Sequence, residues 1–156
     1  MRISERYARA YILKPGDHQA GVDGDSVHMG KVHGGEFLFQ FGSITGDAVL
    51  KFYVGATAGT KTTAIAYKYR LSGADQGSAS ADVFGDATAV VAADALTLTA
   101  ATYDNRLLSI EFDSQAIADG TPWVTPEFSA AADALNVAGV FIGIPRDAGN
   151  DPATII

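Results

Sequence analysis

The sequence predicts an all-β protein, an antiparallel β-sandwich of about seven or eight short strands. Several segments rich in β-branched and aromatic residues alternate between apolar and polar side chains with a period of two. This alternation is typical of strands with one buried face. Gly-rich and Asp-rich connections separate the segments, and no convincing amphipathic helix occurs, although a helix competes at 129–135. The pattern leaves jelly-roll and immunoglobulin-like topologies open.

The clearest strand pair covers residues 47–54 and 62–70, joined by a glycine-bounded loop. Other strands are expected at 36–41, in a short piece of 72–94, from Leu96, at 106–112, at 122–128 and at 135–144. Pro126 predicts an edge or bulged strand at 122–128, because proline has no N–H to donate to a neighbouring strand. The nearly continuous apolar run in 135–144 predicts a central strand.

Two further segments are expected to connect strands. Residues 113–120 predict a helical turn or a wide loop, and Tyr103-Asp104-Asn105 supplies turn chemistry. The predicted core consists of the large apolar side chains that share the inward face of each strand. They are Phe37, Phe39, Leu50, Phe52, Ile65, Tyr67, Leu108, Ile110, Phe112, Val140 and Ile142.

A chain of 156 residues is expected to form one domain, and no internal repeat interrupts it. Residues 1–35 are predicted to be an extended N-terminal arm and segment, because 15–35 is rich in Gly, Asp and His and has few large apolar residues. The sandwich is expected to span 36–145, and 146–156 is expected to form a C-terminal tail.

Charge is divided unevenly along the chain. The formal net charge is −7; residues 1–78 carry +2 and residues 79–156 carry −9. An acidic surface promotes solubility and argues against nucleic acid as a partner. The chain has no cysteine, which fits a reducing compartment, and its first residues do not predict a signal peptide. The longest apolar run, Val137–Ile144, is too short for a membrane span, so no membrane partner is expected.

No residue pattern points to catalysis, a metal or a cofactor. His18, His28 and His33 are close in sequence, but their spacing matches no metal motif. Gly24-Asp25-Ser26-Val27-His28 resembles a nucleophile elbow only superficially, because histidine replaces the second glycine. The acidic residues suggest neither a general acid–base pair nor a complete calcium loop. We therefore expect a non-enzymatic protein without a cofactor.

Contact with other chains is expected at two places. The first 14 residues hold four of the eleven Lys and Arg residues, interspersed with aromatic and apolar ones, and predict an arm that docks on an acidic surface. The alternative is an ordinary first strand whose charged residues face water. A tryptophan beside a proline at a strand start is a candidate for partial exposure, although packing in the core or between subunits is its expected use. The candidate interface residues are Arg2, Arg6, Tyr7, Arg9, Tyr11, Ile12, Lys14 and Trp123.

Several landmarks between residues 20 and 149 resemble small structural proteins of tailed bacteriophages. The segment AGVDGDSVHMGKVHG is similar to their Ala-Gly-x-x-Asp-Gly element, and FQFGSITGDAVLKFYVGAT to their strand, glycine turn and following strand. AIAYKYRLSGA resembles a strand that ends in a Gly-Ala step. LLSIEFDSQAIADG, the following Pro-Trp step and VFIGIPRDAG are similar to a Glu-Phe-Asp strand and a closing Pro-Arg.

This resemblance implies a capsid decoration (cement) protein, made in the cytoplasm of a host bacterium and carried on the virion surface. Its implied partners are the major capsid protein and further copies of itself, arranged as a homotrimer. The strand at 122–128 is a possible intersubunit edge. The alternative is a tail or head-fibre module that binds host-surface glycans, and a β-sandwich hydrolase is the third class. The quoted motifs are structural, so no catalytic residue carries over.

Overall fold

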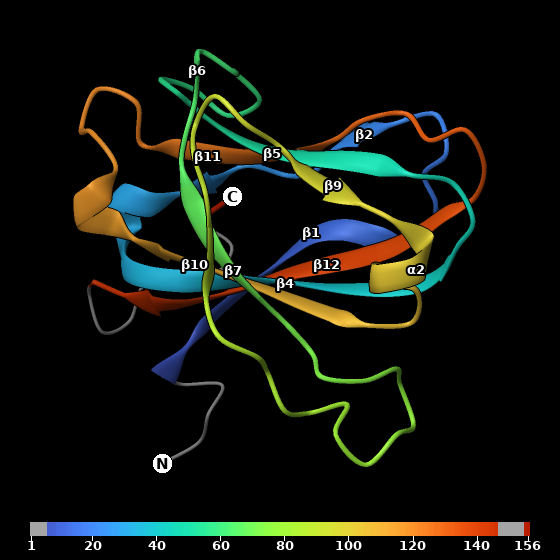
Figure 1. The fold of residues 1–156 in the computed structure, drawn as a ribbon. Helices are drawn as coiled ribbons and strands as arrows, with labels where there is room; N and C mark the ends of the chain where they lie inside the picture. Colours follow the sequence, from blue (N-terminus) through green and yellow to red (C-terminus); the bar gives the residue numbers. More distant parts are fainter. Residues whose placement is uncertain (1–5, 147–154) are drawn as a thin grey trace.

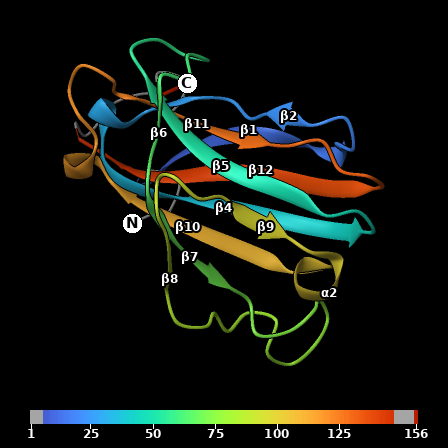
Figure 2. The same ribbon diagram turned by 45° about the horizontal axis from the view of Figure 1, so that its top comes forward.

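The computed structural model describes residues 6–146 and 155–156, which form two antiparallel sheets packed face to face (Figure 1). The turned view of Figure 2 shows the long strands of both sheets running roughly side by side. The predicted all-β sandwich is therefore confirmed. None of the helices in the described part of the chain is long and apolar enough to cross a membrane.

Sheet A contains the longest strands of the protein. Its order is β1 (Ala8–Asp17), β12 (Leu135–Pro145), β4 (Val32–Ile44), β10 (Leu107–Asp113), β7 (Tyr67–Leu71) and β8 (Thr88–Val90). Sheet B has the order β2 (Val22–Asp23), β11 (Trp123–Phe128), β5 (Ala48–Gly55) and β6 (Thr63–Ala64), with β3 (Val27–His28) beside β11 and β9 (Leu96–Leu98) beside β5. The short helices are η1 (Met29–Lys31), α2 (Ala100–Tyr103) and η2 (Ser114–Ala116).

The order of the strands corresponds to a jelly roll. Successive strands alternate between the sheets over much of the chain, and the first strand, β1, pairs directly with the last, β12. In an immunoglobulin fold the first and last strands belong to different sheets. Here sheet A begins with the order β1, β12, β4 and β10. In sheet B, β2 and β3 lie on one side of β11, and β5 lies on its other side with β6 and β9 beyond. This arrangement is that of two Greek keys.

A cluster of phenylalanine rings fills the space between the sheets. Phe37 on β4 is fully buried, and its ring centroid lies 4.8 Å from that of Phe141, 5.1 Å from that of Phe52 and 5.7 Å from that of Phe112. Most of these rings meet edge to face or tilted, which is a favourable arrangement for aromatic pairs. These contacts join β4, β10 and β12 of sheet A to β5 of sheet B.

Most of the predicted core is buried, but the prediction for β12 was wrong. Eight of the eleven named residues are buried, and Ile65 packs against the core from a partly buried position. Val140 and Ile142 point away from the core, whereas Val137 and Phe141 point into it. Both faces of β12 are apolar, so the sequence alternation could not show which face is inside.

The edge position predicted for 122–128 was also wrong. β11 lies inside sheet B, with β5 along one side and β2 and β3 along the other. Proline is tolerated here because the neighbouring segment is interrupted: β3 ends at His28, β2 covers Val22–Asp23, and the chain between them passes opposite Pro126. The Pro126 carbonyl still accepts a bond of 2.9 Å from the Gly24 N–H, so the strand keeps a main-chain bond to this segment at the proline.

The N-terminal segment is a strand of the sandwich, which corrects the predicted boundary at residue 35. β1 pairs with β12 from Ala8 to Asp17, and Ala8, Ala10, Ile12 and Leu13 are all buried. The Ile12 carbonyl accepts a bond of 2.8 Å from the Asp25 N–H, so the 20–25 segment covers part of this sheet edge. The alternative of an ordinary first strand therefore describes residues 8–17. Of the predicted tail, Ile155 is buried and its carbonyl binds the His28 N–H, while 147–154 lies outside the described residues.

Alanine truncations test the assignment of faces. Phe52→Ala or Ile110→Ala is expected to lower the free energy of unfolding by about 2–5 kcal/mol, because each leaves a cavity in the packed core. Ile142→Ala is expected to cost about 1 kcal/mol or less, since Ile142 lies on the outer face. Urea denaturation measures all three. Equal losses at Phe52 and Ile142 would contradict the faces described here.

Deleting residues 2–13 tests whether β1 belongs to the fold. The deletion is expected to unfold the protein or destabilise it severely, because it removes buried side chains and the hydrogen-bonding partner of β12. Circular dichroism and thermal melting measure the outcome. The matched control Arg6→Ala changes an exposed side chain and is expected to alter stability by less than about 0.5 kcal/mol. A truncated protein that melts like the full chain would show that β1 is a dispensable arm.

Candidate functional surfaces

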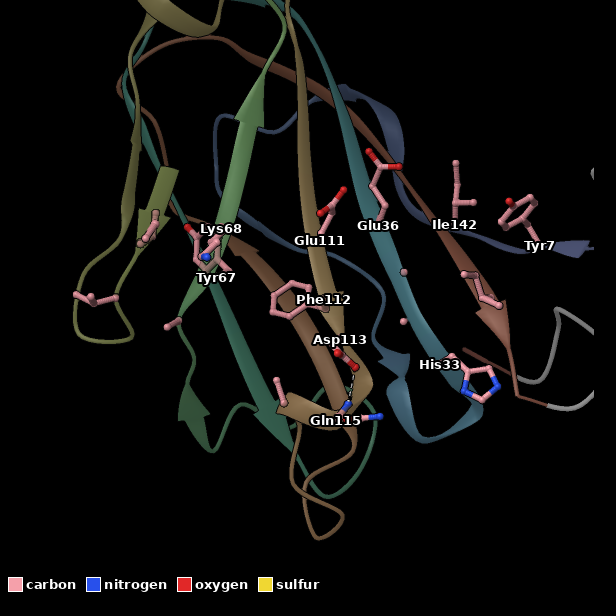
Figure 3. Close-up of a pocket in the computed structure, with 18 residues that line it drawn as sticks. Tyr7, His33, Glu36, Tyr67, Lys68, Glu111, Phe112, Asp113, Gln115 and Ile142 are labelled. Carbon is pink, nitrogen blue, oxygen red and sulfur yellow. Dashed lines mark hydrogen bonds between the residues drawn. The ribbon is translucent and has the colours of Figure 1, made fainter. Parts of the chain in front are cut away.

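The outer face of sheet A consists of rows of side chains that run across the strands. In one row Arg9, Ile142, Glu36, Glu111 and Lys68 follow one another on five adjacent strands. Figure 3 shows the part of this row that contains Glu111, Glu36 and Ile142. Directly opposed residues of antiparallel strands have Cβ atoms about 4.5–5.5 Å apart, so these side chains form a continuous surface.

An apolar stripe occupies the part of this face near the β1 edge. Tyr11 on β1 lies opposite Val140 on β12, and Val140 lies opposite Leu38 on β4. Ile142 and Ile144 continue the stripe along β12. Tyr11 is 78% exposed and Ile144 is 50% exposed, whereas the other three are partly buried by their neighbours. Contiguous exposed apolar patches of this kind are typical of surfaces that contact other molecules.

Acidic groups follow the apolar stripe toward the middle of the sheet. Glu36 and Glu111 are directly opposed like charges on β4 and β10. The Ser109 hydroxyl donates a hydrogen bond to Glu36, and Lys68 lies opposite Glu111 on β7. Asp113 extends the acidic group along β10, where its carboxylate accepts a bond of 2.9 Å from the Gln115 N–H. The face is therefore divided into an apolar and an acidic stripe.

A groove of about 1050 Å³ crosses this outer face (Figure 3). Its lining includes Tyr7 and Ile142 at one end and Lys68 and Val91 at the other. Gly34, on the outward side of β4, leaves the floor there without a large side chain, and the Gly35 backbone lines the groove beside it. The titratable side chains in its lining include three carboxylates, Lys68 and His33, beside apolar groups of β12 and the segment after β8.

The outer face of sheet B is polar and makes its own ion pairs. The Lys61 ammonium group binds the Asp23 carboxylate at 2.9 Å and also the Glu127 carboxylate, and it lies 5.7 Å from the centre of the Tyr53 ring. Hydrogen bonds to Glu127 and Asp23 raise the pKa of Lys61. Burial, together with the charge of Glu127, raises the pKa of Tyr53. These contacts fix the loop before β6 onto the strands β2 and β11.

A histidine–tryptophan pair lies at the end of this polar face. His28 on β3 is opposite Trp123 on β11, with ring centroids 4.9 Å apart in an edge-on arrangement. The Nδ1 atom of His28 is buried and makes no hydrogen bond to another described residue. Burial lowers the pKa of His28, and the nearby Lys31 charge contributes to the same shift. Trp123 is partly exposed, which excludes a fully buried core position and leaves packing between subunits as a prediction.

The predicted interface residues do not form one surface. Arg6 and Lys14 are exposed, Tyr7 lines the groove, and Arg9 and Tyr11 lie on the outer face of sheet A. The prediction for Ile12 was wrong, because its side chain is 2% exposed and belongs to the core. The tryptophan lies on the other sheet, and Arg2 is outside the described residues.

Sequence analysis missed Leu38, Val140, Ile142 and Ile144 as surface residues. The available signal was the nearly continuous apolar run of β12, which indicated two apolar faces.

The three histidines predicted not to form a metal site lie on separate segments, and no group of three or more potential metal ligands occurs among residues 6–146 and 155–156.

The comparisons with known proteins give little further information. No family model matches the sequence, and no curated protein matches it either. Among solved structures, the chain is similar to a chain in the structure of infectious bursal disease virus Gx strain, with 16% identity and a TM-score of 0.20. The match covers 90% of this chain and 41% of the viral one. A likeness at this TM-score carries no argument about fold or function.

The environment of His28 predicts a pH dependence of stability. Because burial lowers its pKa below the usual 6.5, the unfolded chain binds more protons than the folded one under mildly acidic conditions. The contribution of His28 to stability is therefore present above pH 6.5 and is lost as the pH falls through the lowered pKa. Urea unfolding at about pH 7.5 and about pH 5.5 is expected to show a smaller loss on acidification for His28→Gln than for the unsubstituted chain. Identical losses would contradict this assignment.

Proposed function

We propose that this chain is a non-enzymatic structural protein of a tailed-bacteriophage virion, and that it decorates the outer surface of the head. It would bind the major capsid protein and hold neighbouring capsid subunits together. The observation that carries the proposal is the outer face of sheet A, where an apolar stripe and an acidic stripe lie side by side on long, well-packed strands. A protein whose largest distinctive surface suits contact with other chains is suited to assembly.

The landmarks that resemble phage head proteins have structural roles in this fold. Gly21 has a positive φ of 83°, and a Cβ there would lie 2.8 Å from the Ala130 backbone nitrogen. A Cβ on Gly24 would lie 2.7 Å from the ring of Pro126. In the closing Pro-Arg element, the Arg146 side chain donates bonds of 3.1 Å to the Val32 carbonyl and 3.1 Å to the Ser114 hydroxyl. These landmarks are therefore structural in this fold, as the resemblance implies.

The same proposal places the chain on the virion, makes the capsid protein its partner and assigns it no catalytic role. The homotrimer implied by the resemblance remains a prediction, and the two-fold pair proposed below is its alternative. The strand at 122–128, which was predicted to be the edge between subunits, is not a sheet edge, because β11 lies inside sheet B. A jelly roll of this kind offers stability through its core and contact through its faces, and both are properties that a cement protein requires.

Copy number tests the proposed function. Particles purified from the phage that encodes this chain are separated on a denaturing gel and stained, with the major capsid protein as the internal standard. Decoration predicts a number of copies comparable to that of the capsid protein, located on heads freed of tails. A few copies per particle, found with tails or at a single vertex, would favour a fibre module that binds glycans. Absence from purified particles would contradict a virion role.

A further inference from the structure

The outer face of sheet A carries opposite charges at equal distances from a central apolar strand. Ile142 on β12 has Arg9 opposite it on β1 and Glu36 opposite it on β4. The two charged residues therefore lie one strand spacing, about 4.8 Å, to either side of Ile142. Arg9 is exposed, and neither it nor Glu36 forms an ion pair within residues 6–146 and 155–156.

In the neighbouring rows through Val140 and Ile144, the β12 residue likewise lies between a β1-side residue and a β4 residue, and these flanking residues are uncharged. Val140 has Tyr11 on one side and Leu38 on the other. Ile144 has Gly34 on one side, and Tyr7, which directly precedes β1, lines the same groove as both. A large side chain on the β1 side thus corresponds to a smaller side chain or a glycine on the β4 side in each of these rows.

We propose that two copies of this chain pair through the outer faces of their A sheets, about a two-fold axis that runs along β12 and passes between the two Ile142 side chains. A two-fold axis in the interface, parallel to the strands, brings the β1 side of one copy over the β4 side of the other. Arg9 of each copy then faces Glu36 of the second copy. Tyr11 packs on Leu38, and Tyr7 lies over the flat backbone at Gly34.

Self-complementary charge favours a second copy as the occupant of this face. A two-fold interface is isologous, so every contact occurs twice and the surface must complement itself. The order of basic, apolar and acidic residues across β1, β12 and β4 satisfies this condition without any other partner. Sheets that pack face to face lie about 10 Å apart with their strands within about 30° of each other, a separation that the side chains of these rows fill.

The dimensions of the face agree with a small interface. β12 has 11 residues, which span about 36 Å of strand. The axis brings only β1, β12 and β4 over strands of the second copy, which at about 4.8 Å per strand gives a face on the order of 520 Å². Standard protein–protein interfaces bury about 800 Å² on each partner, so the proposed pair belongs with the smaller, weaker ones. The strands β10, β7 and β8 stay uncovered in this pair and open to the capsid contact of the proposed function. The apolar centre here is the row of β12 side chains, and the rim consists of Arg9 and Glu36.

The first experiment measures the mass of the purified full chain by sedimentation equilibrium. Pairing predicts a species of twice the 16.2 kDa chain mass, dissociating on dilution. Arg9→Glu and Glu36→Arg are each expected to weaken the dimer about tenfold or more, because each places like charges opposite one another at two symmetric positions. Asp119→Arg changes an exposed charge on the loop before β11 by the same amount as Glu36→Arg and is the matched control, expected to leave the mass unchanged.

The decisive experiment mixes the two weakened variants, Arg9→Glu and Glu36→Arg. In a mixed pair, the glutamate introduced at position 9 of the first variant would face the arginine introduced at position 36 of the second. At the symmetric contact, the unchanged Glu36 of the first variant would face the unchanged Arg9 of the second. Both contacts are then attractive, so the mixture is expected to form a dimer at concentrations where each variant alone is a monomer. Thermal melts of both variants check that each remains folded.

Three outcomes would overturn the inference. The chain could remain monomeric up to about 1 mM, a concentration at which even a weak specific pair would form. It could have the mass of a trimer. It could form a dimer whose strength does not respond to Arg9→Glu and Glu36→Arg, or that mixing the variants does not restore. Each of these is independent of whether the protein is found on phage heads.

Discussion

The structure depends on the packing of phenylalanine rings between the two sheets. Phe37 contacts rings from β10, β12 and β5, and Phe39 and Phe52 extend the cluster toward Phe128. Rings of this size bury large apolar areas, and their edge-to-face contacts require defined distances between the strands that carry them. The requirement explains why the surrounding strands are long and regular, whereas residues 72–87, outside this cluster, form mostly turns and bends.

β12 connects the core to the surface that we propose as functional. One face of the strand contributes Leu135, Val137 and Phe141 to the core, and the other presents Val140, Ile142 and Ile144. A strand with one face against the core and the other face in solvent usually alternates between apolar and polar residues. β12 does not alternate, although within the described chain nothing buries its outer face as the core buries its inner one. A second copy placed on this face would bury both sides of the strand.

The two outer faces of the sandwich differ in how their charges are satisfied. On sheet B, Lys61 joins Asp23 and Glu127, so the charges of this face compensate one another within the chain. On sheet A, Arg9 and Glu36 lie on opposite sides of an apolar strand and form no ion pair within the described residues. An assembly protein needs a surface whose charges find partners in another molecule. The contrast supports the proposal that sheet A is the face for contacts between chains.

The sequence by itself determined the sandwich class, most strand positions and most of the core, because local alternation reports which residues of a strand share a face. It placed Phe37, Phe52 and Ile110 correctly inside. Only the tertiary structure decided the strand order, the interior position of β11 and the inclusion of β1 in sheet A. Each of these depends on which segments pair across long sequence distances, and alternation within one strand carries no information about its neighbours. The same limit applied to Ile142: with two apolar faces on β12, only packing against Phe37 selected Phe141 for the core and left Ile142 outside.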